Sequence, residues 1–440
     1  MTRLFGTDGV RGKANEDLTP ELVLSLARAT ASFLAPSGGR AIIGRDTRVS
    51  GAMLEGALAA GFAASGLEVL LAGVIPTPAI SFLIKDERAD GGAVISASHN
   101  PPQDNGIKFF DRRGMKLAVE AEREIEARLA GPPCRVRVGR VTALEAAATR
   151  YAAFLTGTIE INEADLSAHT IVVDCAYGST GMIAPRVFRH FNANVIELHT
   201  LPDGERINQG CGSTHLDPLR KAVLDYNADL GVAFDGDGDR VMLISASGET
   251  IDGDRMMGIV ARHMNRNRRL DPKLLVATVM SNLGLEQMLE REGIRMIRTP
   301  VGDRNVAWEM LRQGAKIGGE QSGHIILSDH SPTGDGILTA IKLLEIAHER
   351  GADLGALAEE IPLFPQVRED VPVRDPQRTL QSIPLGELIE AAQRRLGESG
   401  RVLVRPSGTQ PLVRVMVEGE DGALCREVCS ELVEAIKARL

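Results

Sequence analysis

The segment VAFDGDGDR, from Val232 to Arg240, joins a short apolar run to three carboxylates that alternate with glycines. The apolar run predicts a buried strand, and the glycines let the backbone after it curl so that Asp235, Asp237 and Asp239 converge. Converging like charges are costly without a counter-ion, and hard oxygen ligands suit Mg²⁺, Mn²⁺ or Ca²⁺. An EF-hand would need a Gly and a Glu at later positions that hold other residues here. We therefore interpret the segment as a metal-binding loop at a strand end, with a solvated acidic turn as the alternative.

The same rhythm of an apolar run followed by a polar or glycine turn recurs on both sides of this loop. Such runs lie at 41–43, 69–71, 93–95, 170–174, 229–234 and 273–279. A helix is predicted from Thr19-Pro20 to about Leu34, because Thr can cap and Pro suits the first helical position, and an Ala-rich helical stretch spans Gly51 to Ala64. Strands alternating with helices predict three consecutive α/β units with mixed or parallel sheets.

A Pro-rich stretch, Ile361 to Pro376, breaks this pattern and leads into a smaller last domain with strands near 401–404 and 412–417. The final segment carries Cys425 and Cys429 one turn apart on an apolar helical stripe, which indicates packing rather than redox or metal chemistry. We predict four domains, at 1–155, 156–250, 251–365 and 366–440.

Composition excludes several classes of protein. The 440 residues are 43% apolar and 25% charged, values typical of a globular chain of several domains. The net charge of −9 and only 3% aromatic residues argue against nucleic-acid binding. Five cysteines, an odd number, indicate a reducing cytoplasm. The start lacks a signal peptide and the most apolar run, Val69 to Ile84, is broken by prolines, so neither export nor membrane spanning is expected.

Three further segments place polar chemistry in loops. Ser96 to Pro102 puts two hydroxyls and an imidazole at a strand end, although an ordinary turn would have the same composition and no hydrolase elbow is present. Arg405 to Thr409 offers a guanidinium, hydroxyls and a glycine turn that suit a phosphate, or it is a plain tight loop. Gly319 to His324 suits sugar hydroxyls, or it is a polar hairpin turn.

Together these segments resemble the α-D-phosphohexomutase superfamily. The motifs occur in the family's order and cover nearly the whole chain: FGTDGVRG at 5–12, SASHNP at 96–101, DGDGDR at 235–240, GEQSGH at 319–324 and RPSGT at 405–409. The opening motif, INQGCGSTH at 207–215 and Gln321 are similar to the members that act on amino-sugar phosphates. One departure is Gln410, where the family usually has Glu; we expect phosphate binding to persist.

The resemblance implies three related α/β domains and a smaller C-terminal α+β domain, similar to the TATA-box-binding protein, around a central cleft. It implies a phosphoserine at Ser98 and one Mg²⁺ per subunit held by Ser98, Asp235, Asp237 and Asp239. Glu320 and Ser322 would contact sugar hydroxyls. The phosphate that is not reacting would be held by Arg405, Ser407, Gly408 and Thr409 in a last domain that hinges.

The implied reaction interconverts glucosamine 6-phosphate and glucosamine 1-phosphate through a sugar 1,6-bisphosphate that also activates the enzyme, and it feeds UDP-N-acetylglucosamine and cell-wall precursor synthesis. Arg240, Lys108 and Arg11 would compensate charge. Lys108 is the first candidate for moving a proton, His324 the second, and His99 would support the serine loop. Small sugar phosphates are the expected partners, with a homodimer left open.

Three alternatives stay open at this point. A phosphomannomutase or phosphoglucomutase would use the same mechanism on a hexose without the amine. A Mg²⁺-dependent sugar-phosphate phosphatase would release inorganic phosphate. A catalytically inactive sugar-phosphate sensor is disfavoured because Ser98 and all three aspartates are present.

Overall fold

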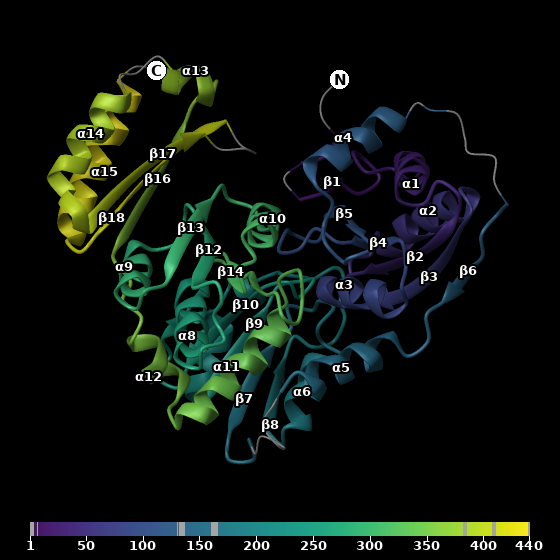
Figure 1. Ribbon diagram of the computed structural model, residues 1–440, viewed down its shortest axis with the longest axis horizontal. Helices are drawn as coiled ribbons and strands as arrows, with labels where there is room; N and C mark the ends of the chain where they lie inside the picture. The colour runs from purple at the N-terminus through teal and green to yellow at the C-terminus, as the bar shows by residue number, and fades with distance from the viewer. Residues whose placement is uncertain are drawn as a thin grey trace. The chain divides into compact units, whose positions relative to one another are not determined.

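The computed structural model describes residues 4–6, 8–129, 131, 137–159, 166–381, 385–406 and 411–438 (Figure 1). These residues form two compact units. The main unit comprises Met1–Met280 and Ile297–Ala358, and the C-terminal unit comprises Ser281–Met296 and Glu359–Leu440. Among the described helices, none has the length and apolar character needed to cross a membrane.

The first sheet of the main unit has six strands in the order β1-β5-β4-β2-β3-β6. Its strands are β1 (Val10–Lys13), β2 (Gly39–Arg45), β3 (Leu67–Val74), β4 (Gly91–Ile95), β5 (Asp104–Asp111) and β6 (Val141–Ala143). β2, β3, β4 and β6 run parallel, and β5 and β1 add an antiparallel edge. The accompanying helices are α1 (Pro20–Leu34), α2 (Gly51–Ala64), α3 (Thr77–Asp86), α4 (Val119–Arg128) and α5 (Ala147–Gly157).

The predicted start of α1 is confirmed, because the Thr19 side chain accepts a hydrogen bond from Leu22 N at 3.3 Å. The predicted helix from Gly51 to Ala64 is confirmed as α2. Apolar side chains from both helices and from β2 and β4 form one buried core. The two helices therefore pack against this sheet through the apolar side chains that the sequence places along them.

The second sheet has the order β11-β10-β9-β7-β8 and the third has the order β13-β12-β14-β15. The second contains β7 (Thr170–Asp174), β8 (Asn194–Leu198), β9 (Leu230–Phe234), β10 (Val241–Ser245) and β11 (Thr250–Ile251). The third contains β12 (Leu274–Thr278), β13 (Arg295–Thr299), β14 (Ile317–Gly319) and β15 (Ile325–Leu327). The helices along this part of the chain are α6 (Ala184–His190), η1 (Gly212–Thr214), α7 (Asp217–Asp225), α8 (Gly253–Arg266), α9 (Leu283–Arg291), α10 (Asp303–Gln313), α11 (Gly336–Arg350) and α12 (Leu354–Glu359).

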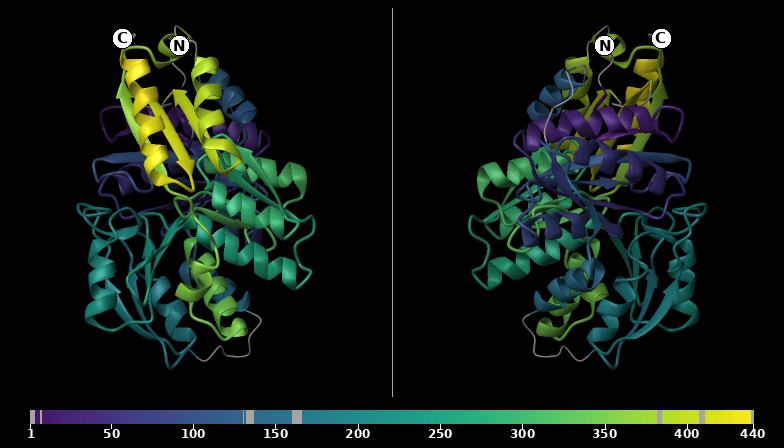
Figure 2. Two further views of the ribbon diagram at one scale, coloured as in Figure 1. Left: turned by 90° about the vertical axis from the view of Figure 1, so that its left-hand side faces the viewer. Right: turned by 90° about the vertical axis from the view of Figure 1, so that its right-hand side faces the viewer.

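The C-terminal unit contains a three-stranded antiparallel sheet in the order β16-β18-β17. Its elements are β16 (Gln366–Pro372), α13 (Pro376–Gln381), α14 (Leu385–Leu396), η2 (Gly397–Ser399), β17 (Gly400–Pro406), β18 (Leu412–Gly419) and α15 (Gly422–Lys437). Figure 2 shows α14 and α15 lying along this sheet. Cys425 and Cys429 are buried in its core, so their interpretation as packing residues is confirmed.

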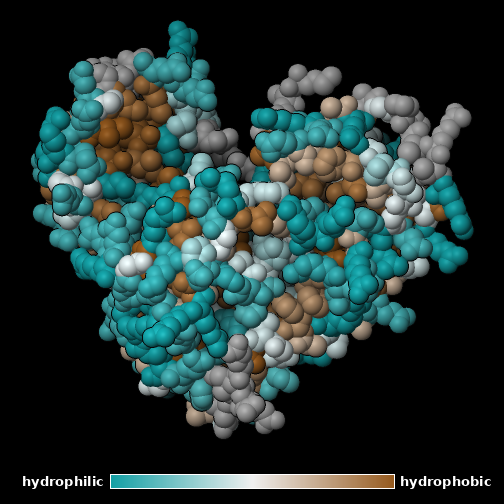
Figure 3. Space-filling view, in the orientation of Figure 1, coloured by the Kyte–Doolittle hydropathy of each residue, from teal (hydrophilic) through white to brown (hydrophobic). Residues whose placement is uncertain are grey.

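One strand of this unit is not among the predicted elements. The Pro-rich stretch from 361 to 376, which breaks the α/β pattern and leads into the last domain, also contains β16. β16 pairs with β18 along its whole length, from Gln366 opposite Glu418 to Pro372 opposite Leu412. Local sequence hides this strand because its hydrogen-bonding partner comes later in the chain. In Figure 3 hydrophobic surface lies over this unit, whose core is flanked by partly buried apolar side chains such as Leu388, Val402 and Val404.

The predicted fold class is confirmed: three α/β parts with mixed sheets precede a small C-terminal part with an antiparallel sheet. The four domain boundaries stay predictions.

Candidate functional site

Strand ends place the predicted site residues of the main unit. Ser98 follows β4, the Asp235–Asp239 loop follows β9, and Glu320 follows β14. In α/β sheets the carboxyl ends of strands are where ligands bind. The sequence motifs therefore end up where the fold leaves backbone and side chains available for chemistry.

Ser98 has a left-handed backbone with φ of 52°, which is uncommon for a residue other than glycine. Its side chain is buried and Oγ donates a 2.5 Å hydrogen bond to Asp235 Oδ2. Its amide donates to Ser96 Oγ at 2.8 Å. The turn thus aims the Ser98 hydroxyl directly at the acidic loop of the second sheet.

Asp235, Asp237 and Asp239 are buried, and each offers a carboxylate oxygen within 4.8 Å of the others. Burial, followed by Asp239 and Asp237, raises the pKa of Asp235 to about 8. Asp237 Oδ1 and Asp239 Oδ1 are buried and accept no hydrogen bond from the residues that the structure describes. Hard oxygens with unused lone pairs fit a divalent cation such as Mg²⁺.

Lys108, on β5, is fully buried against the same loop. Its ammonium contacts Asp237 Oδ2 at 2.8 Å, Asp239 Oδ2 at 3.3 Å and Asp8 Oδ2 at 3.3 Å. Burial lowers the pKa of Lys108, but these three carboxylates outweigh it and hold the pKa well above the usual value. Lys108 is therefore a cation here that compensates charge and holds its proton more tightly than an ordinary lysine.

His99 lies between Ser98 and Arg240. Arg240 donates to His99 Nδ1 at 3.0 Å, and Ser98 Oγ lies 3.5 Å from the same nitrogen. Burial, followed by the charges of Arg240 and Arg11, lowers the pKa of His99 to about 4. A neutral ring that accepts from a guanidinium supports the loop and carries no charge of its own near neutral pH.

An ion network missed by the sequence reasoning surrounds this centre. Asp8 accepts from Arg11 at 2.5 Å and from Lys116 at 2.7 Å, and Lys116 also pairs with Asp303 at the start of α10. Burial raises the pKa of Asp8, but Lys108, Lys116 and Arg11 bring it well below the usual value. Asp8 belongs to the motif FGTDGVRG at 5–12, and that motif could have indicated its part in the site. No sequence motif indicated Lys116 or Asp303.

The hairpin between β14 and β15 brings the predicted sugar loop beside the acidic loop. Glu320 Oε1 accepts from Gly302 N at 3.0 Å, while Ser322 is exposed. His324 is buried, with Nε2 accepting from Gly334 N at 3.1 Å and Nδ1 lying 3.7 Å from Asp239 Oδ1. In the neutral ring the proton therefore sits on Nδ1 and faces Asp239.

In the C-terminal unit, the structure describes Arg405 and Pro406 of the predicted phosphate segment. Ser407, Gly408, Thr409 and Gln410 lie outside the described residues. Arg405 is opposite Arg414 on β18. Partial burial, followed by Arg414 and Arg368, lowers the pKa of Arg405. Three arginines gather on one sheet with Asp370, whose Oδ1 lies 3.6 Å from Arg414 Nε, and the positive charge that remains suits an anion.

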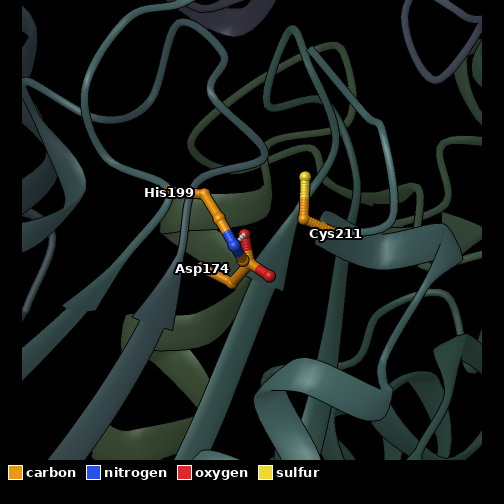
Figure 4. A group of neighbouring side chains, drawn as sticks. All are labelled: Asp174, His199 and Cys211. Atoms are coloured by element: carbon orange, nitrogen blue, oxygen red, sulfur yellow. Dashed lines mark ion pairs between the residues drawn. The ribbon is translucent and has the colours of Figure 1, made fainter. Parts of the chain in front are cut away.

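A second polar group lies at the carboxyl end of β7 (Figure 4). Figure 4 shows His199 turned toward Asp174 with Cys211 beside them, and His199 Nδ1 lies 3.1 Å from Asp174 Oδ1. Both carboxylate oxygens of Asp174 accept backbone N–H groups, from Ala176 at 2.9 Å and Gly212 at 3.0 Å. Burial raises the pKa of the Cys211 thiol to about 12, so it stays protonated. This group fastens the 174–212 loops together.

Four family models match successive parts of the chain. They are described as phosphoglucomutase/phosphomannomutase α/β/α domains I, II and III and the C-terminal domain, and they match residues 2–132, 149–248, 252–364 and 366–435. Together they cover most of the sequence.

Relatives and solved structures agree with these matches. A phosphoglucosamine mutase from Carboxydothermus hydrogenoformans is 48% identical over 445 residues, covering 99% of this chain and 100% of the relative. Another from Pelotomaculum thermopropionicum is 50% identical, covering 99% of each. A phosphoglucomutase/phosphomannomutase family protein from Burkholderia thailandensis superposes with a TM-score of 0.83 at 26% identity, covering 100% of this chain and 98% of that one.

Proposed function

Because the chain belongs to the phosphoglucomutase/phosphomannomutase family, we propose that it is an isomerase that interconverts glucosamine 6-phosphate and glucosamine 1-phosphate. The observation that carries the amino-sugar substrate is the identity of 48% and 50% to two full-length phosphoglucosamine mutases. A hexose without the amine is the less favoured substrate.

The reaction begins with Ser98 carrying a phosphoryl group. The sugar O1 attacks that phosphorus and loses its proton, the Ser98 Oγ–P bond breaks, and the Ser98 oxygen takes up a proton, which gives the 1,6-bisphosphate. After this intermediate turns round, Ser98 Oγ loses its proton and attacks the phosphorus of the 6-phosphate. The O6–P bond breaks and O6 takes up a proton, which releases glucosamine 1-phosphate and restores the phosphoserine. Phosphoryl transfer needs in-line positioning and charge neutralisation more than covalent chemistry.

Positioning is supplied by the Ser98 turn, whose Oγ already lies 2.5 Å from Asp235. Lys108 and Arg240 offset the charge of the aspartates and the phosphoryl group. The raised pKa of Lys108 keeps it an ammonium that holds its proton firmly, so its main part is to hydrogen-bond and neutralise the oxygen that leaves. Lys108 is the first proposed candidate for moving a proton and His324 is the second. His99 acts through the loop rather than by exchanging protons.

The donor set supports Mg²⁺ as the bound metal, with Asp235, Asp237 and Asp239 as its protein ligands and Ser98 contributing an oxygen. When bound, the ion would withdraw charge from the phosphoryl group and fix its orientation. The two buried oxygens of Asp237 and Asp239 without hydrogen-bond donors are the observation behind this assignment.

Glu320 and Ser322 would hold sugar hydroxyls. Arg405, with Ser407, Gly408 and Thr409, would hold the phosphate that is not reacting, and Arg368 and Arg414 would add positive charge to that place. Small sugar phosphates are the proposed partners and the cytoplasm the proposed location. The domain boundaries and hinge motion given above belong to the same proposal.

The test is the intact mass of the purified protein and of Ser98→Ala, paired with an assay of glucosamine 1-phosphate formation with Mg²⁺ and a bisphosphate primer. We expect a phosphate-sized excess and turnover in the wild type, and neither in the variant. If the protein carries phosphate but turns over only mannose or glucose phosphates, the mutase mechanism stands and the amino-sugar substrate is wrong. Release of inorganic phosphate without isomer would indicate a phosphatase, and neither phosphate nor turnover would refute the mutase.

A further inference from the structure

The Ser98 loop is held by hydrogen bonds from Arg48, a fully buried arginine just after the carboxyl end of β2. All five of its side-chain N–H donors face acceptors. Nε donates to Asp46 Oδ2 at 2.9 Å, and the two terminal nitrogens donate to four backbone carbonyls, those of Ser98, Asn100, Pro101 and Asp104. A single guanidinium thereby binds the carbonyl of the reactive serine and three carbonyls of the turn that follows it.

Asp46 completes this arrangement. Its carboxylate is buried and accepts from Arg48 and from Ser96 Oγ at 2.7 Å. Ser96 Oγ in turn accepts the Ser98 amide at 2.8 Å. The left-handed φ of Ser98 is therefore held from its N–H by Ser96 and from its carbonyl by Arg48, which offsets the strain of that conformation.

Asn208 reaches the same turn from the second sheet's loops. Its Nδ2 donates to the Ser98 carbonyl at 2.9 Å and to the Asn100 carbonyl at 3.0 Å, the two carbonyls that also accept from one nitrogen of Arg48. A Cβ on Gly236 would come within 2.9 Å of both Asn208 Nδ2 and the Ser98 carbonyl. Glycine in the acidic loop is thus what leaves space for this contact.

The Asn208 segment is itself held rigidly. Asn208 N donates to the Ala176 carbonyl at 3.0 Å, and Asp174 binds the amides of Ala176 and Gly212 on either side. Asp174, which Figure 4 shows beside His199 and Cys211, therefore anchors the segment that presents Asn208 to the serine turn. This gives a physical use to the INQGCGSTH motif.

We propose that Arg48 and Asn208 are positioning residues that jointly hold the Ser98 carbonyl, so that Oγ points at the acidic loop in both half-reactions. This inference rests on the proposed function for its kinetic consequence. Neither side chain contacts the reacting oxygen. A shift of the reactive group by about 1 Å can cost on the order of a hundredfold in rate, so loss of either donor lowers kcat rather than substrate binding.

The experiment compares Asn208→Ala and Asn208→Asp with Asn194→Ala, a control whose amide donates to Thr170 within the same domain. Asn208→Asp keeps the shape but replaces the donating nitrogen by an oxygen that repels the carbonyls. We expect kcat to fall about tenfold or more in both Asn208 variants, with the Asp variant at least as impaired, and KM to stay within about twofold. Arg48→Lys keeps the positive charge but loses the planar guanidinium and its five donors, so we expect the same fall in kcat. Arg40→Lys, at the other end of β2, is the matched control.

A second readout separates this proposal from the proposed function. Hydrogen exchange of peptides spanning 96–104 should be faster in the Asn208 and Arg48 variants than in the controls, whatever the substrate. Unchanged exchange, wild-type kcat in Asn208→Asp, or a change confined to KM would overturn the positioning role. If hydrogen exchange is faster in the variants as expected but the wild-type protein turns over no amino-sugar phosphate, the proposed substrate is wrong and the positioning role stands.

Discussion

Charge compensation decides which side chains surround Ser98. Asp8, Asp237 and Asp239 face Lys108, Lys116 and Arg11, and these cations come from two segments of the chain, β1 and the segment that holds β5 and the turn after it. A buried charge that loses its partner costs far more than a surface pair is worth. The network is therefore as much a condition for folding of this region as a device for handling phosphate.

Lys108→Met leaves Asp8, Asp237 and Asp239 without their shared ammonium. We expect the variant to lose about 3–5 kcal/mol of stability in the absence of divalent cations, because the carboxylates stay buried. Mg²⁺ should then raise its Tm more than it raises that of the wild type. Thermal unfolding with EDTA and with Mg²⁺ measures both, and equal Mg²⁺ shifts would contradict the assignment of this loop as the cation site.

Asp335 caps α11, accepting from Leu338 N at 3.0 Å and from the Tyr151 hydroxyl at 2.8 Å. Burial raises the pKa of Asp335 to about 6, above the value of about 3.9 in an unfolded chain. Between these values the folded state keeps a proton that the unfolded state has lost, so the Asp335 contribution to stability falls as pH rises from about 4 to 6. Asp335→Asn should remove about 1–3 kcal/mol of this dependence. Urea unfolding of both proteins at pH 4.5 and 6.5 checks it, and parallel pH profiles would contradict it.

At the scale of single elements, a helix cap depends on neighbouring residues, whereas strand pairing depends on residues far away in the chain. α15 begins after Asp421, whose side chain accepts from Ala423 N at 2.8 Å and Leu424 N at 3.1 Å. This cap depends on neighbouring residues only, so it is written in the local sequence. β16 depends on β18 for its ladder, which no local pattern records.

Asp421→Ala should cost about 1 kcal/mol, because two N–H groups at the start of α15 lose their acceptor. The loss belongs to the C-terminal unit, so hydrogen exchange should quicken in α15 and stay unchanged in α2. Asp421→Asn, which keeps an acceptor oxygen, is the matched control and should stay near wild type. Equal losses in the two variants would show that charge rather than capping matters.

At the scale of the whole molecule, two units have cores of their own. Independent cores predict unfolding in more than one step. The single Trp of the chain, Trp308, lies in α10 of the main unit and reports on that unit alone. Fluorescence of Trp308 and far-ultraviolet circular dichroism should therefore give urea transitions that do not coincide; superimposable curves would mean that the units unfold together.

The amino-acid sequence by itself determined the features that depend on near neighbours. The cap of α1, the buried runs of β4 and β9 and the loops after them follow from residue order, so Ser98 and the three aspartates could be found as strand-end motifs. Only the tertiary structure decided which charges and carbonyls meet. Asp8 with Lys116, and Arg48 and Asn208 on one carbonyl, join residues far apart in the chain. Their pairing is set by tertiary packing, because a buried polar group can be satisfied only by a partner that folding brings to it.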